Sequence, residues 1–452
     1  MNNRVRLSQC MIVKNEEENI RRALTWGKDI MYEQIVVDTG STDRTVEIAK
    51  ELGAKVFHFT WINDFSAAKN FAIEQATGSW IAFLDADEYF SPEDVKKILP
   101  LIARMEKATP VTQRPVIIRT SLANLDDSGE VESVMSHDRL FRKMPKLRYL
   151  SKVHEYLDET GLGGRVFDAK NSLTIFHTGY TSAAFNGKNK MERNISILEQ
   201  VVEEDPGNCD AWLYLGNSYY GKGWYELAEE VYYRVLDHIE DMEGNELKEL
   251  FFCNFLHLKY EKVIRKEDWK LIDQEEDVLN IYNRSIDHNC ASPDAELWVG
   301  KWMFAKGKKQ EGVAYFELAL KKLEQYKENG LLIISGELPK VYQILFETHR
   351  LLNHPQEAVR YATLYLRMEP FGKEVLTGLL QLFGNSMGDE KTAEASLGFL
   401  SKMYDFSRAR DKFFLIEVSR EGFFPALESK VNALLTQEEK DFLQESLKKL
   451  KN

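Results

Sequence analysis

The sequence predicts an α/β domain with a Rossmann-like, mostly parallel sheet, followed by an all-α region of helical repeats. In the first half, short apolar runs alternate with helical stretches, and the connections are long enough for right-handed crossovers between parallel strands. From residue 186 onward the strand signals largely disappear and helical periodicity dominates. We therefore expect two domains, at residues 1–185 and 186–452.

Composition narrows the class of protein. The 452 residues carry 59 Lys and Arg against 72 Asp and Glu, a net charge of −13, so we expect no nucleic-acid partner. The four cysteines are widely spaced and form no CxxC motif, which favours a reducing compartment and predicts neither disulfides nor a zinc site. No apolar run approaches the roughly 18 residues of a membrane span, and the N-terminus lacks a signal-peptide pattern. We expect a soluble, cytoplasmic protein without a membrane span.

Four strands and their connecting helices are expected before residue 85. The strands are predicted at residues 7–13, 34–37, 55–59 and 80–84, and helices at 45–52 and 64–76. The first strand breaks at a polar turn, where Asn15 is expected to cap the following helix. The last strand is an unbroken apolar run too short for a helix, typical of a strand buried on both faces of a parallel sheet. Ser91 and Pro92 then start another helix.

Carboxylates follow two of these strands. Asp38 ends the second strand, and Asp85 and Asp87 follow the fourth. Open α/β sheets bind ligands at the carboxyl ends of their strands. Side chains at i and i+2 of an extended chain point the same way, which suits one hard divalent cation. The pattern predicts a nucleotide site in which one acid contacts the base or ribose and the others hold a metal against phosphates.

Motifs of other nucleotide-binding classes are absent from the sequence. Neither GxGxxG nor GxxxxGK[ST] occurs, which excludes dinucleotide dehydrogenases and P-loop NTPases. The Gly-rich loop with a following Arg that nucleotidyltransferases carry is also missing. An EF-hand is excluded because Phe90 stands where that loop needs glycine.

Five segments in order resemble a family 2 glycosyltransferase of the GT-A fold. They are CMIVKNEEENIRRAL, IVVDTGSTDRTVEIA, NDFSAAKNFAIEQATGSWIAFLDADE, KVHEYL and IFHTGY, and together they cover about residues 5–185. The order of the five motifs carries the resemblance, because each motif alone is weak. The resemblance implies a metal-dependent, inverting transfer of sugar from a nucleotide diphosphate donor, expected to be UDP-linked.

The resemblance also assigns roles on the donor side. It implies that the donor contacts Val13, Asn15, Glu16, Asp38, Ser41, Asp43, Lys69, Asp85, Ala86 and Asp87. Asp38 would contact the base, and Asp85 and Asp87 would contact the ribose and the metal. Where the family usually has Arg, this chain has Lys69, which keeps the charge but lacks a bidentate fork.

Two later motifs imply the acceptor base and a further metal ligand. Glu155 is expected to deprotonate the acceptor as general base, with Asp138 as the second candidate. His154 belongs to the predicted catalytic set and could instead orient the acceptor. His177 is expected to join the two DxD carboxylates around Mn²⁺ or Mg²⁺; an imidazole with two carboxylates suits Mn²⁺ at least as well as Mg²⁺.

A basic stretch lies between residues 139 and 152, with six Lys or Arg residues and no acid. We expect a solvated hairpin for most of them. One or two could instead face the diphosphate or an anionic acceptor.

The second half shows one clear repeat. Residues 208–237 carry the W-x₂-L-G-x₂-Y spacing of a tetratricopeptide repeat (TPR) in Trp212, Leu215, Gly216 and Tyr219. Weaker copies are expected at 294–320 and 339–370, the last with Phe346 where the repeat has glycine. The sequence thus predicts a TPR-like helical domain whose aromatic residues mostly form its core.

This layout resembles bacterial peptide glycosyltransferases that modify Cys or Ser of bacteriocin precursors. It implies a peptide acceptor, with a helical domain that binds the peptide and could also join two copies of the chain. Cell-wall and surface glycans remain open as acceptors. From another class, the chain could be a non-catalytic TPR scaffold with a nucleotide-sugar-binding fold. A nucleotidyltransferase is a third alternative. The sequence identifies neither the sugar nor the attacking atom.

Overall fold

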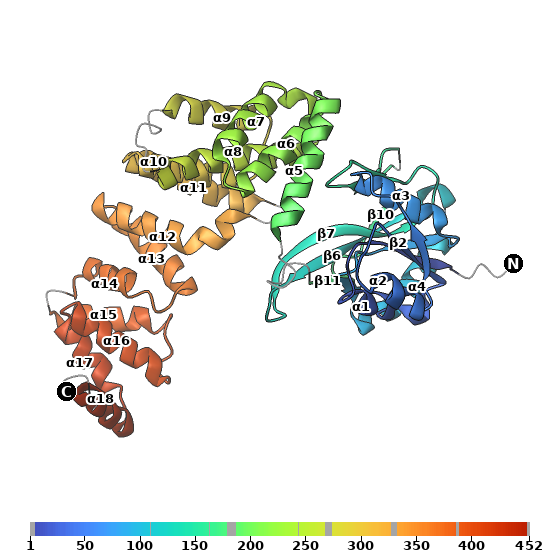
Figure 1. Ribbon diagram of the computed structural model, residues 1–452. Coiled ribbons are helices and arrows are strands. Elements are labelled where there is room, and N and C mark those ends of the chain that lie inside the picture. Colours follow the sequence, from blue (N-terminus) through green and yellow to red (C-terminus); the bar gives the residue numbers. More distant parts are fainter. Residues whose placement is uncertain are drawn as a thin grey trace. The chain divides into compact units, whose positions relative to one another are not determined.

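The computed structural model describes residues 5–108, 110–161, 163–178, 187–242, 244–266, 274–326, 332–385 and 388–449. It divides into two compact units, Met1–Leu247 with Glu328–Leu331, and Lys248–Lys327 with Leu332–Asn452. The first unit contains a mixed β-sheet with its covering helices, followed by the first helices of the all-α region. The second unit is helical in its described parts (Figure 1). The predicted fold class is therefore confirmed. The predicted division at residues 185 and 186 follows the change from strands to helices and stays a prediction.

The main sheet has nine strands in the order β3-β2-β1-β4-β7-β6-β11-β5, with β10 paired to β6. They are β1 (Leu7–Val13), β2 (Glu33–Asp38), β3 (Lys55–His58), β4 (Trp80–Phe83), β5 (Glu88–Phe90), β6 (Ile117–Leu125), β7 (Val131–Arg142), β10 (Val166–Asp168) and β11 (Thr174–His177). Neighbours from β3 to β4 are parallel, and β7 is antiparallel to both β4 and β6. The four predicted strands therefore form one parallel half of the sheet, and their carboxyl ends share one edge.

Helices cover both faces of this sheet (Figure 1). They are α1 (Ile20–Thr25), α2 (Thr45–Glu51), α3 (Phe65–Gln75) and α4 (Pro92–Lys107), with the short helices η1 (Lys28–Ile30) and η2 (Val111–Gln113). Alternate residues of β4 point to opposite faces. Ile81 and Phe83 pack with α3, whereas Trp80 and Ala82 pack with α4. Both faces are therefore apolar, which explains the unbroken hydrophobic run.

Side-chain caps begin helices α3 and α4, but the cap expected for the helix after β1 is wrong. Asp64 accepts a hydrogen bond from Ala67 N at 2.8 Å at the start of α3, and Ser91 accepts from Asp94 N at 3.2 Å at the start of α4. The expected cap at Asn15 is wrong, because α1 begins only at Ile20. Asn15 instead has a φ of 57°, and its side-chain oxygen accepts from Thr42 N at 2.7 Å in the next loop.

The basic stretch is partly a sheet strand. Its first residue, Arg139, belongs to β7 at the centre of the sheet and is buried. The expectation of a solvated hairpin is therefore wrong for Arg139, because β7 pairs with β4 and β6 on its two sides. Only the end of the stretch enters a separate hairpin, formed by β8 (Tyr149–Leu150) and β9 (Tyr156–Leu157).

The rest of the described chain is helical. In the first unit lie α5 (Gly187–Glu204), α6 (Cys209–Gly221), α7 (Tyr225–Asp237) and η3 (Ile239–Asp241), and α8 (Asn245–Lys266) begins at its end. The second unit continues with α9 (Glu275–Asp287), α10 (Asp294–Ala305), α11 (Lys309–Gln325), α12 (Ile333–Leu351), α13 (Pro355–Met368), α14 (Lys373–Leu382), α15 (Glu390–Leu400), α16 (Ala409–Glu421), α17 (Pro425–Ala433) and α18 (Gln437–Lys449).

Glycine packing explains the repeat spacing. A Cβ at Gly216 of α6 would lie 2.5 Å from the Tyr232 ring of α7, so the predicted TPR glycine allows the two helices to approach. In the third copy Phe346 replaces that glycine, and Gly378 of α14 provides the space instead, since a Cβ there would lie 2.8 Å from the Phe346 ring. The third copy also begins earlier than predicted, at Ile333.

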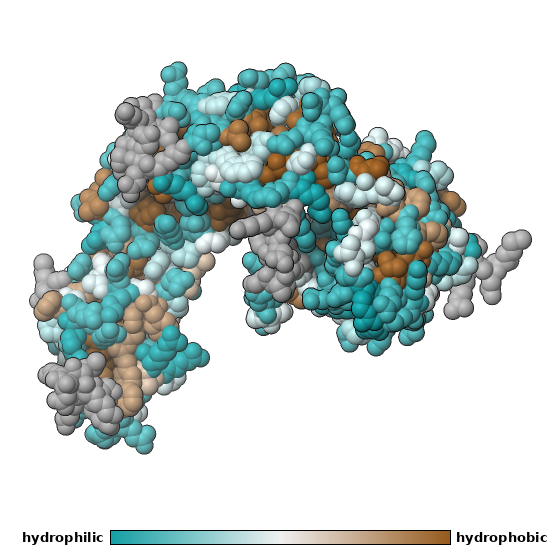
Figure 2. All heavy atoms as spheres, viewed as in Figure 1, coloured by the Kyte–Doolittle hydropathy of each residue, from teal (hydrophilic) through white to brown (hydrophobic). Residues whose placement is uncertain are grey.

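The structure bears on two expectations from composition. None of the helices within the described ranges is both long and apolar enough to cross a membrane. All four cysteines are buried free thiols. On the face shown in Figure 2, hydrophilic residues are interspersed with smaller hydrophobic patches.

Candidate functional site

A cavity of about 980 Å³ opens where the parallel strands β1 and β4 end. Backbone and side chains that follow these strands line it, as expected for the ligand edge of an open α/β sheet. The predicted site residues that line it are Val13, Glu16, Lys69, Asp85, Ala86, Asp87, Asp138, His154, Glu155 and His177. Residues separated by up to 164 positions in the sequence thus meet at one edge of the sheet.

Three other predicted donor residues lie beside the cavity and join two loops. Ser41 Oγ accepts a hydrogen bond from Asn15 N at 3.0 Å, and Asp43 Oδ2 accepts from Glu17 N at 3.1 Å. The loop after β1 is therefore held against the loop after β2 by side chain to backbone bonds. These bonds position Glu16, which does line the cavity.

Asp38 lies at the end of β2, directly opposite Val13 of β1, but is not itself among the lining residues. Its side chain is only 6% exposed. It accepts hydrogen bonds from Ser41 N at 3.0 Å and Gly40 N at 3.3 Å. Burial would raise the pKa of Asp38, but the bonds from Ser41, His58 and Gly40 outweigh it and lower the pKa. Asp38 is therefore an ionised acceptor at neutral pH.

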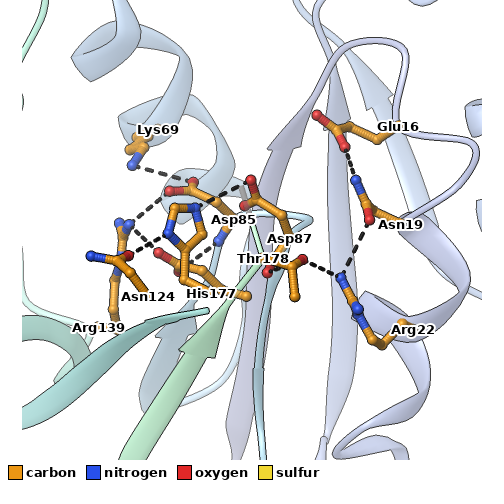
Figure 3. A network of polar contacts seen from close by, with 11 residues as sticks. Glu16, Asn19, Arg22, Lys69, Asp85, Asp87, Asn124, Arg139, His177 and Thr178 are labelled. Atoms are coloured by element: carbon orange, nitrogen blue, oxygen red, sulfur yellow. Dashed lines mark hydrogen bonds and ion pairs between the residues drawn. The ribbon is translucent and has the colours of Figure 1, made fainter. Parts of the chain in front are cut away.

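Asp85 is clamped between two cations (Figure 3). Lys69 Nζ lies 3.5 Å from its Oδ1, and Arg139 Nη2 lies 2.7 Å from its Oδ2. Arg139 also contacts Glu88 at 2.7 Å, and Glu88 accepts from Asp85 N at 3.0 Å. Burial would raise the pKa of Asp85, but Arg139 and Lys69 hold it well below its usual range. Both oxygens of Asp85 thus already have a protein cation as partner.

Asp87 faces a histidine whose ring is oriented from behind (Figure 3). Asn124 Oδ1 lies 2.7 Å from His177 Nδ1, and His177 Nε2 lies 3.3 Å from Asp87 Oδ2. If Nδ1 donates to Asn124, the neutral ring turns a lone pair toward the Asp87 carboxylate, and two acceptors at this distance need a proton or a metal cation between them. In agreement, Asp87 raises the pKa of His177 although burial opposes it.

The Asp87 backbone is held from the opposite side. Thr178 N donates to Asp87 O at 3.1 Å, and Arg22 Nη2 donates to Thr178 Oγ1 at 2.6 Å. The Arg22 guanidinium lies 4.8 Å from the centre of the Tyr89 ring. It also donates a hydrogen bond to Asn19, which in turn donates one to Glu16 (Figure 3). This chain of hydrogen bonds therefore connects Glu16, which lines the cavity, to Thr178 and the Asp87 backbone. The last two residues of the IFHTGY motif, 179 and 180, lie outside the described residues.

Glu155 and Asp85 share a buried lysine. Lys69 Nζ lies 2.7 Å from Glu155 Oε1, and its side chain is 3% exposed. Burial would lower the pKa of Lys69, but Asp85 and Glu155 raise it, so the amine stays protonated. Rings of Phe83 and Tyr149 lie 5.2 and 5.1 Å from the ammonium. This cation keeps the predicted base and the DxD motif in one charge network.

Asp138, the second candidate base, belongs to another ion pair. Arg119 donates to both of its oxygens at 2.9 and 2.7 Å and also contacts Glu159 at 2.8 Å. Burial and the neighbouring Asp138 raise the pKa of Glu159 to about 7. A bidentate partner makes Asp138 less available for proton transfer than a carboxylate bound by one cation.

Several residues of this network escaped the sequence analysis. Arg139 belongs to the basic stretch and Glu88 to the acidic turn, so the sequence showed both charges but not their partners. Asn124 and Arg22 carry no local signal, because their partners lie 53 and 156 positions away along the chain.

Residues 8–156 match the family described as Glycosyl transferase family 2. A TPR repeat-containing protein of Synechococcus elongatus is 38% identical over 214 residues, which are 46% of this chain and 50% of the relative. The SPbeta prophage-derived glycosyltransferase SunS of Bacillus subtilis is 32% identical over 212 residues, 45% of this chain and 46% of the relative. The chain thus spans about half the length of these curated relatives.

Among solved structures, S. aureus TarS 1-349 in complex with UDP-GlcNAc is similar with a TM-score of 0.35 and 16% identity. The similarity covers 59% of this chain and 89% of that chain. A likeness at this level has no bearing on the activity.

Proposed function

We propose that the chain, whose residues 8–156 match the Glycosyl transferase family 2 description, is a metal-dependent, inverting glycosyltransferase with a UDP-linked sugar donor. One observation carries the proposal. The Asp87–His177 pair and the Lys69-bound Glu155 line one cavity at the carboxyl edge of the sheet. A cation-binding pair and a base in a shared cavity are what nucleotide-sugar transfer requires.

On the donor side, Asp38 bears on which nucleotide base the donor carries. Asp38 is an ionised acceptor, and a base N–H would replace one of its present donors, such as His58 Nδ1 at 3.3 Å. Uracil and guanine present a ring N–H to such an acceptor, whereas adenine does not. We therefore expect UDP or GDP donors, with the nucleotide along the loops after β1 and β2.

The residues present fit a divalent cation with few protein ligands. Within the described ranges no three His, Cys, Asp or Glu residues are grouped for a metal. Asp87 and His177 would hold the cation, with donor oxygens and water as further ligands. Asp85 is the poorer ligand, because Lys69 and Arg139 already bind its oxygens. When bound, Mn²⁺ or Mg²⁺ supplies positive charge for the departing diphosphate.

On the acceptor side, Glu155 would take the proton of the attacking group. The acceptor atom then forms a bond to the anomeric carbon as the bond to the diphosphate oxygen breaks, and the nucleoside diphosphate leaves with the electron pair. Attack opposite the leaving group inverts the anomeric configuration. Lys69 would keep Glu155 oriented and charged until the acceptor arrives.

The acceptor we propose is a peptide Cys or Ser side chain, bound with the help of the TPR-like helices, which could also join two copies of the chain. This rests on the order of the domains, residues 1–185 followed by 186–452. We place the enzyme in the cytoplasm, since four buried free thiols suit a reducing compartment. Cell-wall or surface glycans are the alternative acceptors.

Calorimetry with the purified protein tests the proposal. UDP, GDP and their sugars are titrated with Mn²⁺, with Mg²⁺ and with EDTA, beside Asp87→Ala and the control Asp126→Ala in an exposed turn. We expect metal-dependent binding of one nucleotide sugar that is lost only in Asp87→Ala. Absence of binding by every donor with either metal would contradict the proposal and favour a non-catalytic TPR scaffold.

A further inference from the structure

The predicted base lies in a hairpin with an unusual backbone. Between β8 and β9, Ser151 has a φ of 72° and His154 a φ of 56°. Non-glycine residues adopt this left-handed conformation only at an energetic cost, so neighbouring contacts must maintain it. Glu155 follows His154 directly, and the direction of its side chain depends on that turn.

Helix α3 contacts the hairpin on both sides of His154. Asn70 exchanges two hydrogen bonds of 2.9 Å with the backbone of Tyr149. Phe65 N donates to Lys152 O at 2.9 Å. Both backbone anchors precede His154, and after it Lys69 of the same helix binds the Glu155 side chain. The left-handed turn at His154 lies between these two points.

Helices α5 and α6, which follow the sheet, contact this part of the hairpin. The imidazole of His154 stacks on the Tyr214 ring of α6, with centroids 4.3 Å apart and planes 18° apart. Lys152 also pairs with Glu204 of α5 at 2.5 Å. Burial lowers the pKa of His154, so a neutral ring stacks on the tyrosine. Helices α5 and α6 belong to the same compact unit as the sheet.

Helix α5 also borders the cavity itself. Arg193 lines it, and its guanidinium lies 4.7 Å from the centre of the Phe65 ring at the start of α3. Lys190 and Asn194 of the same helix line the cavity too. This side of the cavity is therefore lined by the hairpin together with α5.

We propose that Tyr214 is a positioning residue, which stacks on His154 and thereby holds the turn that places Glu155 against Lys69. The inference rests on the proposed function and extends it. Helix α6 becomes part of the catalytic unit, in addition to any role of the repeats in binding an acceptor.

Hydrolysis of the donor tests this role without a known acceptor, because water can take its place. UDP release from UDP-glucose and UDP-N-acetylglucosamine with Mn²⁺ is measured for Tyr214→Phe, which keeps the stacked ring, and Tyr214→Leu, which removes it. Trp212→Ala on the same helix is the control, since Trp212 stacks with Arg234 away from the hairpin. Hydrogen exchange of residues 149–157 is measured on the same proteins without donor.

We expect Tyr214→Leu to lower kcat by about tenfold or more with little change in the donor KM, because a small displacement of the base suffices for such a loss. Amides of residues 149–157 should exchange faster in this variant only. Tyr214→Phe and Trp212→Ala should match the wild type.

An unchanged kcat in Tyr214→Leu, or a loss confined to the donor KM, would overturn the inference. So would hydrogen exchange in 149–157 equal to that of the wild type. If the wild type releases UDP from no donor, the proposed function fails, and the exchange experiment still decides whether Tyr214 holds the hairpin.

Discussion

Lys69 brings its ammonium to 2.7 Å from Glu155 while 3% of its side chain is exposed. The same ammonium lies 3.5 Å from Asp85. One buried cation therefore balances the predicted base and the first DxD carboxylate together. We therefore expect Lys69 to contribute both to folding and to the proposed transfer.

Replacing Lys69 by Met should destabilise the protein by about 3 kcal/mol, because Glu155 loses its buried cation while Asp85 keeps Arg139. UDP release should fall as well, since Glu155 loses the contact that orients it. Lys69→Arg keeps the charge and should lose less of both. Urea unfolding followed by fluorescence gives the stability, and a wild-type midpoint for Lys69→Met would refute the shared-cation view.

Local patterns predicted much of the fold and part of the site. The apolar run of β4 and the caps at Asp64 and Ser91 depend on neighbouring residues, so their elements could be placed before the structure was known. Asn15 was misassigned because its side chain bonds to Thr42, 27 positions away, instead of to the nearest helix. Phe346 likewise depends on Gly378 of a later helix.

The partners within the site could not be predicted for the same reason. The DxD motif indicated where carboxylates cluster, but its geometry depends on β7, which inserts beside β4 from a later part of the chain. Arg139 reaches Asp85 because β7 pairs with β4 in one particular register, and no local pattern encodes that register.

Glu33 should make stability depend on acidic pH. Its side chain, 4% exposed, accepts from Ser8 Oγ at 2.8 Å, Thr77 N at 2.6 Å and Lys55 at 2.7 Å. Burial would raise its pKa, but these bonds lower it from 4.5 to about 2. A lowered pKa stabilises the fold above pH 4.5, and the stabilisation is lost as the pH falls toward 2. It corresponds to roughly 3 kcal/mol.

Glu33→Gln removes this contribution and should flatten the fall in stability between pH 4.5 and pH 2.5. Urea unfolding at a series of pH values measures it. Glu132→Gln, at an exposed position of β7, should keep the wild-type pH dependence. Parallel curves for wild type and Glu33→Gln would contradict the assignment.

The two DxD carboxylates should respond differently to amide substitution. Asp85→Asn leaves Arg139 and Lys69 with less negative charge in a buried site and should lower stability by several kcal/mol. Asp87→Asn should unfold close to the wild-type midpoint but lose metal-dependent donor binding, because among the described residues its side chain pairs with His177 and not with a buried cation. Thermal unfolding and calorimetry with Mn²⁺ separate the two effects. Equal stability losses in both variants would show that Asp87 is as structural as Asp85.

Asn124 should tune metal affinity through the histidine. Its side-chain oxygen, 2.7 Å from His177 Nδ1, fixes the ring tautomer that leaves Nε2 facing Asp87. Loss of such a supporting contact commonly weakens metal binding by about 10–100-fold. Asn124→Leu should therefore weaken Mn²⁺ binding in the presence of UDP by a factor in this range, measured by electron paramagnetic resonance of free Mn²⁺. Asn124→Asp keeps an acceptor and should remain within a few-fold of the wild type. If both variants bind Mn²⁺ as tightly as the wild type, His177 is not a ligand, and its contact with Asp87 is a protonated ion pair that stabilises the end of β11.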